Sequence, residues 1–234
     1  MYTFESRVRF SEVDATEKLT LPGVVNYFQD CTTFQSEELG RGIEALKAIG
    51  KGWILSSWQI EVNRYPKICE KLKIEPWATT FDGIYGNRNF RLRTENDEVL
   101  ARANSIWVYM DLVKGRPLRP DQDVISAYEI DPPLDMEPVS RKIALPKELE
   151  EREAFPVLRH QIDVNNHVNN CQYIQMALEV LPECGRAKKI RVEYKKSAKF
   201  GDMICPKVAI EADRKVVELC GTDGSVFAVV EMRE

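Results

Sequence analysis

Eleven consecutive residues in the second half of the chain, Asp163–Tyr173, carry the side chains best suited to chemistry. They include the carboxylate of Asp163, four asparagines and His167, one of only two histidines in 234 residues. A carboxylate and an imidazole can transfer protons, and carboxamides can hold a water molecule or a carbonyl oxygen. Apolar residues at helical spacing follow. The sequence therefore predicts a site at a helix N-terminus, where free backbone N–H groups and the positive end of the helix dipole lie.

The elements that must position this site follow from the periodicity of the apolar residues. Residues 168–182 are apolar nearly all round the predicted helix, which is typical of a buried helix. A first helix is expected over 21–39, where Pro22 suits the first turn. Residues 115–150 are Pro-rich and charged, and we expect a connector there with a short helix at 147–152. Alternating residues and turn signals predict strands near 53–63, 71–81, 86–95, 99–110, 189–197, 203–213, 215–221 and 225–232.

The two halves of the chain can be laid over each other. Val8-x5-Asp14 leads through a polar loop into the first helix, and Val157-x5-Asp163 leads through a polar loop into the second. Such a repeat indicates a duplicated unit, a helix followed by antiparallel strands that wrap on it. The edges of the two sheets could pair, which would remove two exposed edges. The match extends along the later strands, Ile60-Glu-Val62 with Val192-Glu-Tyr194 and Pro66 with Ala198.

Composition excludes several classes of protein. Apolar residues make up 44% and charged residues 30% of the chain, as in ordinary globular proteins. The net charge of −4 argues against a general nucleic-acid binder. No apolar run approaches the roughly 18 residues that span a bilayer. We see no export signal, so we expect a cytoplasmic protein whose six cysteines are reduced and mostly buried. Their spacing suits no metal site, and we expect no metal and no cofactor.

The pattern Asp163-x-Asn165-x-His167-Val-Asn-Asn-x-x-Tyr173-Ile resembles the signature of the acyl-acyl-carrier-protein (acyl-ACP) thioesterases. A shorter form, Asp-x3-His-Val-Asn-Asn-x2-Tyr, is shared more widely by hotdog-fold thioesterases, and Asn165 favours the carrier-protein branch. The resemblance is weakest over 120–150. It continues into the first half at Asn26-Tyr-Phe-Gln-Asp, Trp53-Ile-Leu-Ser, Trp107-Val-Tyr-Met-Asp111 and Gly115-Arg-Pro-Leu-Arg-Pro120.

The resemblance implies an α+β fold of two tandem hotdog units, each an antiparallel sheet wrapped on a central helix. We expect an N-terminal unit over 1–130 that binds the acyl chain, a connector over 131–152 and a catalytic unit over 153–234. The implied reaction, of the bacterial type of the family, hydrolyses the thioester of a fatty acyl-ACP and releases the free acid and the carrier thiol. The implied partner is therefore acyl carrier protein. Hotdog sheets often pair, so a homodimer is also compatible with the sequence.

One departure from the family pattern concerns the strand after the site helix. Plant members end that strand in a Glu-Cys pair with proposed catalytic roles, whereas this chain has Ser197 and Ala198 there. The absent cysteine argues against a Cys-His-Asn mechanism. Ser197 could still hold a water by hydrogen bonding, but a hydroxyl cannot act as a carboxylate base.

For a thioester, the preferred scheme is attack by a water that Asp163 and His167 activate, with Asn165 as a positioning group. A covalent anhydride on Asp163 stays open as an alternative. Backbone N–H groups near 168–170 would polarise the carbonyl oxygen. The competing interpretations are structural: a cap and turn for Asp163 and Asn165, a brace for His167, helix core for Tyr173 and an inert buried thiol for Cys171.

Two further groups of residues could contact the substrate. Basic residues are dense over 186–199, and Lys189, Arg191 and Lys195 are expected on the outer face of a strand, where they would suit an acidic carrier protein or simply form a solvated edge. The family places the acyl chain largely in the first unit, where Trp53, Trp58, Phe28 and Phe34 are candidates, although such aromatics are more often simple core.

Three rival functions remain at this point. A hotdog thioesterase could act on coenzyme A esters instead of carrier esters. The Ser197 substitution also makes a non-catalytic acyl-binding or carrier-docking protein conceivable, and a dehydratase has weaker support.

Overall fold

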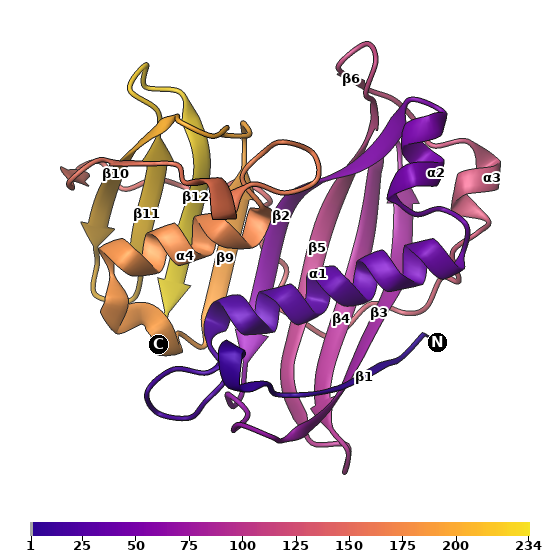
Figure 1. The fold of residues 1–234 in the computed structure, drawn as a ribbon, viewed down its shortest axis with the longest axis horizontal. Coiled ribbons are helices and arrows are strands. Elements are labelled where there is room, and N and C mark those ends of the chain that lie inside the picture. Colours follow the sequence, from indigo (N-terminus) through magenta and orange to yellow (C-terminus); the bar gives the residue numbers. More distant parts are fainter. Residues whose placement is uncertain (1) are drawn as a thin grey trace. The chain divides into compact units, whose positions relative to one another are not determined.

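The computed structural model describes residues 2–234 and divides into two compact units. The first comprises Met1–Ser56 and Glu61–Pro138, and the second comprises Ser57–Ile60 and Val139–Glu234. Each unit contains one long helix on an antiparallel sheet, which is the architecture that the duplicated sequence pattern predicts (Figure 1).

The first unit is built on the helix α1 (Leu21–Glu38), whose start follows from local sequence. The Thr20 hydroxyl accepts a hydrogen bond from Gly23 N at 3.1 Å, and Pro22 lies in the first turn, where its missing N–H has no cost. The sheet runs in the order β1-β3-β4-β5-β2. Its elements are β1 (Phe4–Arg7), β2 (Lys51–Val62), β3 (Lys71–Asp82), β4 (Tyr85–Thr94), β5 (Val99–Asp111) and β6 (Arg116–Pro117), with the short helices α2 (Ile43–Ala48) and α3 (Gln122–Ile125).

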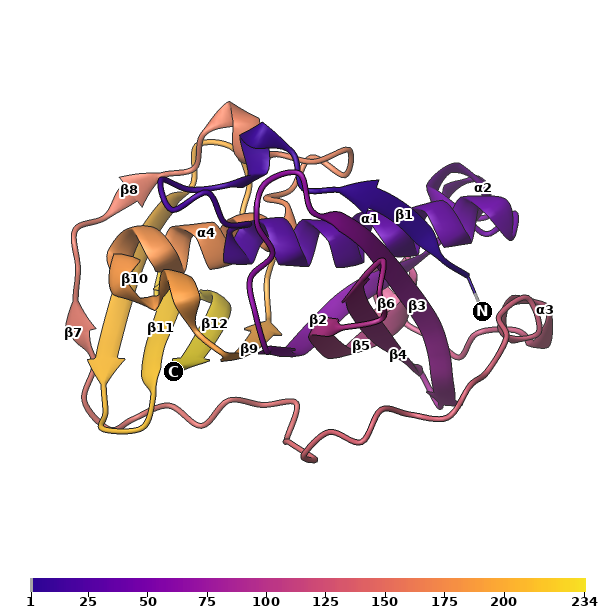
Figure 2. The same cartoon turned by 90° about the horizontal axis from the view of Figure 1, so that it is seen from below.

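The core of the first unit lies between α1 and one face of this sheet (Figure 2). Phe28 of α1 and Phe90 of β4 are fully buried, with ring centroids 5.2 Å apart. Cys31, one turn further along α1, is also buried and its thiol contacts the Ile74 carbonyl of β3 at 3.3 Å. Of the expected acyl-slot aromatics, Phe34 instead lies on the outside of α1, where it is 41% exposed and packs on Phe4.

The second unit repeats this plan around α4 (Asn170–Val180), which packs on β11 and β12. The strand order is β9-β12-β11-β10-β7, with β8 also paired to β10. Alternate residues of β9, Ile190 and Val192, are buried toward α4, as a period of two requires. The strands are β7 (Glu150–Glu151), β8 (Phe155–Pro156), β9 (Lys189–Tyr194), β10 (Met203–Ile210), β11 (Lys215–Cys220) and β12 (Val226–Arg233).

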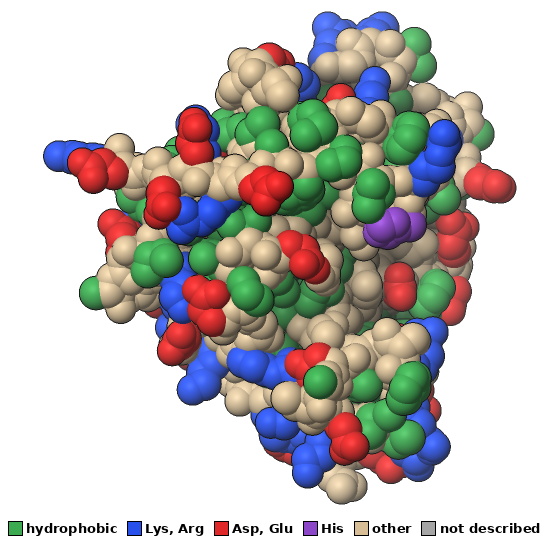
Figure 3. All heavy atoms as spheres, turned by 60° about the vertical axis from the view of Figure 1, so that its left-hand side comes forward, with side chains coloured by type: hydrophobic (Ala, Val, Ile, Leu, Met, Phe, Trp, Pro, Cys, Tyr) green, Lys and Arg blue, Asp and Glu red, His purple; other side chains and the backbone are tan. Residues whose placement is uncertain are grey.

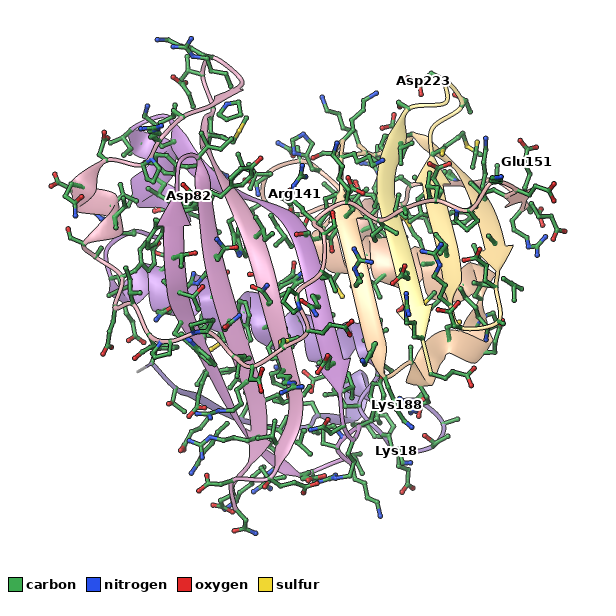
Figure 4. The ribbon with its side chains drawn as sticks, turned by 180° about the vertical axis from the view of Figure 1, so that it is seen from behind. Lys18, Asp82, Arg141, Glu151, Lys188 and Asp223 are labelled. Atoms are coloured by element: carbon green, nitrogen blue, oxygen red, sulfur yellow. The ribbon has the colours of Figure 1, made fainter. Side chains whose placement is uncertain are left out.

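A stretch of the connector crosses the outer face of the second sheet, opposite α4 (Figure 4). We call residues 139–145 the strap. Ile143 packs on Val216 and Val229 of the outer face, and its backbone N donates to the buried carboxylate of Glu193 at 3.0 Å. The guanidinium of Arg191 donates to two strap carbonyls at 2.6 and 3.2 Å. The strap therefore covers a sheet face that carries both apolar and charged residues.

The two long predicted helices and the eight longer strands are confirmed to within a few residues at their ends. The short helix expected at 147–152 is wrong: Glu150 and Glu151 form β7 and pair with Val208 and Lys207 of β10. The segment has no apolar face that a helix could bury, whereas an edge strand satisfies its backbone groups. The helices α2 and α3 were not predicted, because four to six residues are too short for a periodic signal.

Candidate functional site

The residues that could do chemistry form one tight turn between the 3-10 helix at Arg159–Gln161 and α4. Asp163 N donates to the His167 carbonyl at 2.8 Å, and Asn166 N donates to the Asp163 carbonyl at 3.0 Å. Asn166 has a φ of 58°, a left-handed conformation that asparagine adopts more readily than most residues. Inside the turn, the Asp163 carboxylate accepts a hydrogen bond from Asn165 N at 2.8 Å. The turn thus brings Asp163, Asn165 and His167 together.

The helix start beyond the turn uses most of its backbone donors. Asn169 caps α4, since its side-chain oxygen accepts from Cys171 N at 2.9 Å. Val168 N donates to Ala198 O and Asn169 N donates to Gln161 O, each at 2.9 Å. The expectation that the N–H groups near 168–170 together hold a carbonyl oxygen is therefore wrong for the first two. Asn170 N makes no hydrogen bond to any residue between 2 and 234, so it alone is available.

Two tyrosines brace this helix start. The hydroxyl of Tyr173 accepts from Ala198 N at 2.8 Å, and the hydroxyl of Tyr194 donates to the Asn170 carbonyl at 2.9 Å. Their rings meet edge to face with centroids 5.9 Å apart. Burial and the charges of Asp202 and Asp163 raise the pKa of Tyr173 to about 12 despite the hydrogen bond from Ala198 N, which lowers it, so the hydroxyl stays neutral. Tyr173 thus holds the helix start as well as filling the helix core that we expected, and Tyr194 makes a second such contact, which no sequence signal indicated.

Among the groups on the turn that have no hydrogen-bond partner in residues 2–234, four have the chemistry to take part in a reaction. They are the second carboxylate oxygen of Asp163, the carboxamide of Asn165, the imidazole of His167 and the Asn170 N–H. Asn165 is exposed, and Asp163 and His167 are half-buried, so solvent and a ligand can reach all three side chains. The set combines a base, a proton carrier and two donors within eight residues, which are the groups that attack on a carbonyl carbon needs.

The first unit contains the same turn without these groups. Asp14 N donates to the Lys18 carbonyl at 3.1 Å, Glu17 N donates to the Asp14 carbonyl at 2.9 Å, and Glu17 has a φ of 60°. The Asp14 carboxylate accepts from Thr16 N at 2.9 Å, as that of Asp163 does from Asn165 N. The aspartate at this position therefore has a structural role in both units. Only the second turn adds an asparagine and a histidine, at the places of Thr16 and Lys18.

Ser197 and Cys171 differ in their access to the site. Ser197 is exposed in the turn after β9, and its neighbour Ala198 bonds to both Val168 and Tyr173, which ties that turn to the start of α4. Cys171 is 1% exposed within α4. Its burial fits the interpretation as an inert thiol. Four of the six cysteines are buried, as expected.

The basic residues expected to meet a carrier protein have different surroundings. Arg191 is engaged by the strap and by Glu231, whose carboxylate lies 3.4 Å from the guanidinium, so we do not retain it as a carrier contact. Lys189 and Lys195 are exposed. On the face that Figure 3 shows, acidic and basic side chains are interspersed and neither sign dominates.

Replacing Asn169 by alanine should lower the free energy of unfolding by about 1 kcal/mol, the usual cost of a lost helix cap. Because its oxygen is already bonded to Cys171 N, we expect kcat/KM to fall by less than about fivefold, a change that misalignment of a neighbouring turn can cause. Urea unfolding and steady-state rates measure the two effects. Thr20→Ala, which removes the equivalent cap of α1, is the matched control. A loss of activity of two decades at unchanged stability would identify Asn169 as a reactant.

Two family models match the chain. The model described as the acyl-ACP thioesterase N-terminal domain matches residues 1–128, and the model of the C-terminal domain matches residues 145–221. The chloroplastic oleoyl-acyl carrier protein thioesterase of Coriandrum sativum is 24% identical over 97% of this chain and 68% of its own length. The chloroplastic palmitoyl-acyl carrier protein thioesterase of Cuphea hookeriana is 30% identical over 75% of this chain and 45% of its own length. The chain thus spans between about half and two thirds of these relatives.

Solved structures agree in fold. An acyl-ACP thioesterase from Bacteroides thetaiotaomicron matches with a TM-score of 0.90 and 23% identity, over 99% of this chain and 96% of that one. The 12:0-ACP thioesterase from Umbellularia californica matches with a TM-score of 0.84 and 18% identity, again over 99% and 96%. No helix between residues 2 and 234 is both long and apolar enough to cross a membrane. The two matching domain models cover most of the chain, which therefore belongs to the acyl-ACP thioesterase family of hotdog-fold thioester hydrolases.

Proposed function

We propose that the turn before α4 hydrolyses fatty acyl-ACP thioesters to a free fatty acid and the carrier thiol. The observation that carries the proposal is the set of four unengaged groups, on Asp163, Asn165, His167 and Asn170, in a turn that backbone hydrogen bonds hold in place. The equivalent turn of the first unit keeps the same backbone and the same aspartate but lacks the histidine and the asparagines. We therefore assign a structural role to the first turn and the reaction to the second.

In the proposed mechanism, a water molecule attacks the thioester carbonyl carbon. The free oxygen of Asp163 accepts a proton from this water, with His167 beside it as the second proton acceptor. The Asn170 N–H, at the positive end of α4, and the Asn165 amide donate to the carbonyl oxygen as it gains negative charge. The carbon–sulfur bond then breaks, and the carrier leaves as a thiolate. A covalent Asp163 anhydride would use the same groups in two steps.

The acyl carrier protein is the proposed partner, because the names of the relatives at 24–30% identity specify it. The test compares thiol release from one fatty acyl chain carried by ACP and by coenzyme A. We expect kcat/KM to be at least tenfold higher for the carrier ester. Equal or higher turnover of the coenzyme A ester would assign the chain to the other substrate class, and no release above the buffer rate from either ester would favour a binding protein.

Reversing the charge of Lys195 and Lys199 together should raise KM for the carrier ester by roughly five- to tenfold through lost attraction to an acidic partner. Both are exposed, and they flank Ser197 and Ala198, which adjoin the helix start. Turnover of a pantetheine thioester without a carrier should stay unchanged. Lys188→Glu, a single reversal against the double one, is the control for position, since Figure 4 shows Lys188 at the opposite end of β9, about 20 Å away along the strand. If Lys188→Glu raised KM for the carrier ester as much, the effect would come from the net charge of the protein and not from a contact beside the site.

A further inference from the structure

A charged residue interrupts the apolar row that the first sheet presents to α1. Alternate residues of β4 face the helix, namely Gly86, Arg88, Phe90 and Leu92, and all four are buried. Figure 1 shows α1 crossing the strands of this sheet. Arg88 is only 8% exposed, whereas its neighbour Asn89 points to the other face and holds the backbone of Leu134. Arg88 is therefore a core position occupied by a cation.

The guanidinium of Arg88 has no carboxylate partner among residues 2–234. It donates from Nη2 to the side-chain oxygen of Gln35 on α1, and it lies 5.3 Å from the centre of the Tyr128 ring. Its Nε is buried and unbonded. Burial lowers the pKa of Arg88 from its ordinary value, yet an arginine side chain stays protonated in proteins. A buried cation without an anion is costly, and elsewhere in this unit the buried carboxylate of Glu75 is paired with two arginines.

Other buried polar atoms of the first unit also lack partners among the described residues: Thr32 Oγ1, Trp53 Nε1 and Tyr109 Oη. Thr32 lies three residues before Gln35 on α1, hence on the same helix face. The others join Arg88 through a chain of ring contacts. Tyr128, which stacks on the guanidinium, has its ring 5.9 Å from that of Phe81; the Phe81 ring is 5.9 Å from Trp53, and the Trp53 ring is 4.8 Å from Tyr109.

These four unbonded atoms can all donate a hydrogen bond, and two of them, on Arg88 and Trp53, can only donate. Buried polar groups in native proteins are bonded, so such a set implies an acceptor that binds there. A hydrocarbon chain offers none. We propose that the interior of the first unit binds an acyl group that carries a hydrogen-bond-accepting oxygen, a carboxylate or a ketone, against Arg88. The inference rests on the proposed function, because it assumes that this unit receives the acyl chain of a thioester substrate.

The test measures thiol release from three acyl-ACP esters of equal chain length: one saturated, one with a terminal carboxylate and one with an internal ketone. We expect wild type to favour at least one oxygen-bearing chain roughly tenfold or more in kcat/KM, the scale of a hydrogen bond to a charged group. Arg88→Met should remove that preference, so that kcat/KM for the saturated chain equals or exceeds that for the oxygen-bearing chains. The two oxygen-bearing esters distinguish an anionic ligand from a neutral one. A preference for the saturated chain that Arg88→Met does not alter would overturn the proposal.

A binding measurement separates this inference from the hydrolytic proposal. The ligands are the monomethyl ester of a dicarboxylic acid and the methyl ester of the monocarboxylic acid of equal length. The first should raise the melting temperature of wild type more than the second does, and Gln35→Leu and Arg88→Lys should weaken that difference. This result would stand even if no ester were hydrolysed. Equal shifts from the two ligands in wild type would show that the donors hold only water.

Discussion

Replacing Asp163 by asparagine should lower kcat/KM for acyl-ACP hydrolysis by roughly two decades or more, the scale of a lost general base. The substitution keeps an oxygen that can accept from Asn165 N, so the turn is retained. It removes the negative charge and the basic oxygen that would accept a proton from water. Steady-state thiol release measures the loss, and circular dichroism and thermal unfolding verify that the fold is intact.

Asp14→Asn is the matched control for this prediction. Asp14 makes the same turn in the first unit, where its carboxylate accepts from Thr16 N at 2.9 Å. We expect less than a twofold change in kcat/KM for Asp14→Asn and a similar, small change in stability for both variants. If both variants lost activity equally, or if Asp163→Asn lost almost none, Asp163 would have only the structural role that it shares with Asp14.

Replacing Glu231 by glutamine should lower the free energy of unfolding by about 3 kcal/mol, the usual loss when one partner of a buried ion pair is removed. Its carboxylate is 1% exposed on the outer face of β12. Arg214 donates to it at 2.8 Å, and Arg233 and Arg191 lie 3.3 and 3.4 Å away. Arg191 and Arg214 also donate to carbonyls of the strap, so the charge of Glu231 orders both residues that hold the strap. Urea unfolding at neutral pH measures the loss.

The stabilisation by Glu231 should depend on pH. Burial alone raises the pKa of Glu231, but the hydrogen bond from Arg214 and the charges of the three arginines outweigh it, so the pKa lies below its ordinary value. The unfolded chain then binds the proton more readily. The contribution is therefore complete above the ordinary glutamate pKa of about 4.3 and is lost as the pH falls through the lower folded value. The difference between wild type and Glu231→Gln should shrink below about pH 4; a difference that stayed constant there would contradict the ion-pair account.

The sequence could predict the two-unit plan because local signals repeat in it. Polar turn residues follow Val8 and Val157, and an apolar helical pattern after each turn marks a helix start. The structure repeats the same hydrogen bond in both units: Leu19 N donates to Pro66 O, and Val168 N donates to Ala198 O. The three side chains predicted for the site lie on one turn because the first and the last are only four positions apart in the sequence.

Other features depended on contacts between distant residues and had no sequence signal. The strap carbonyls of Ser140 and Lys142 lie 51 and 49 residues before Arg191, so their hydrogen bonds with Arg191 could not be predicted from its alternation in β9. Which backbone N–H groups at the start of α4 are already bonded could not be predicted either, because Val168 N donates to the carbonyl of Ala198, thirty residues further along the chain. The buried position of Arg88 also follows only from the structure, because arginine alternating with apolar residues usually indicates a solvent-facing row.

The most direct test of the proposed reaction centre is the time course of thiol release when purified protein is mixed with an excess of fatty acyl-ACP. We predict release of many equivalents of thiol per protein molecule, and matching release of free fatty acid. Release no faster than in buffer, with the fold intact and the ester bound, would contradict the claim that the turn before α4 is a site of hydrolysis.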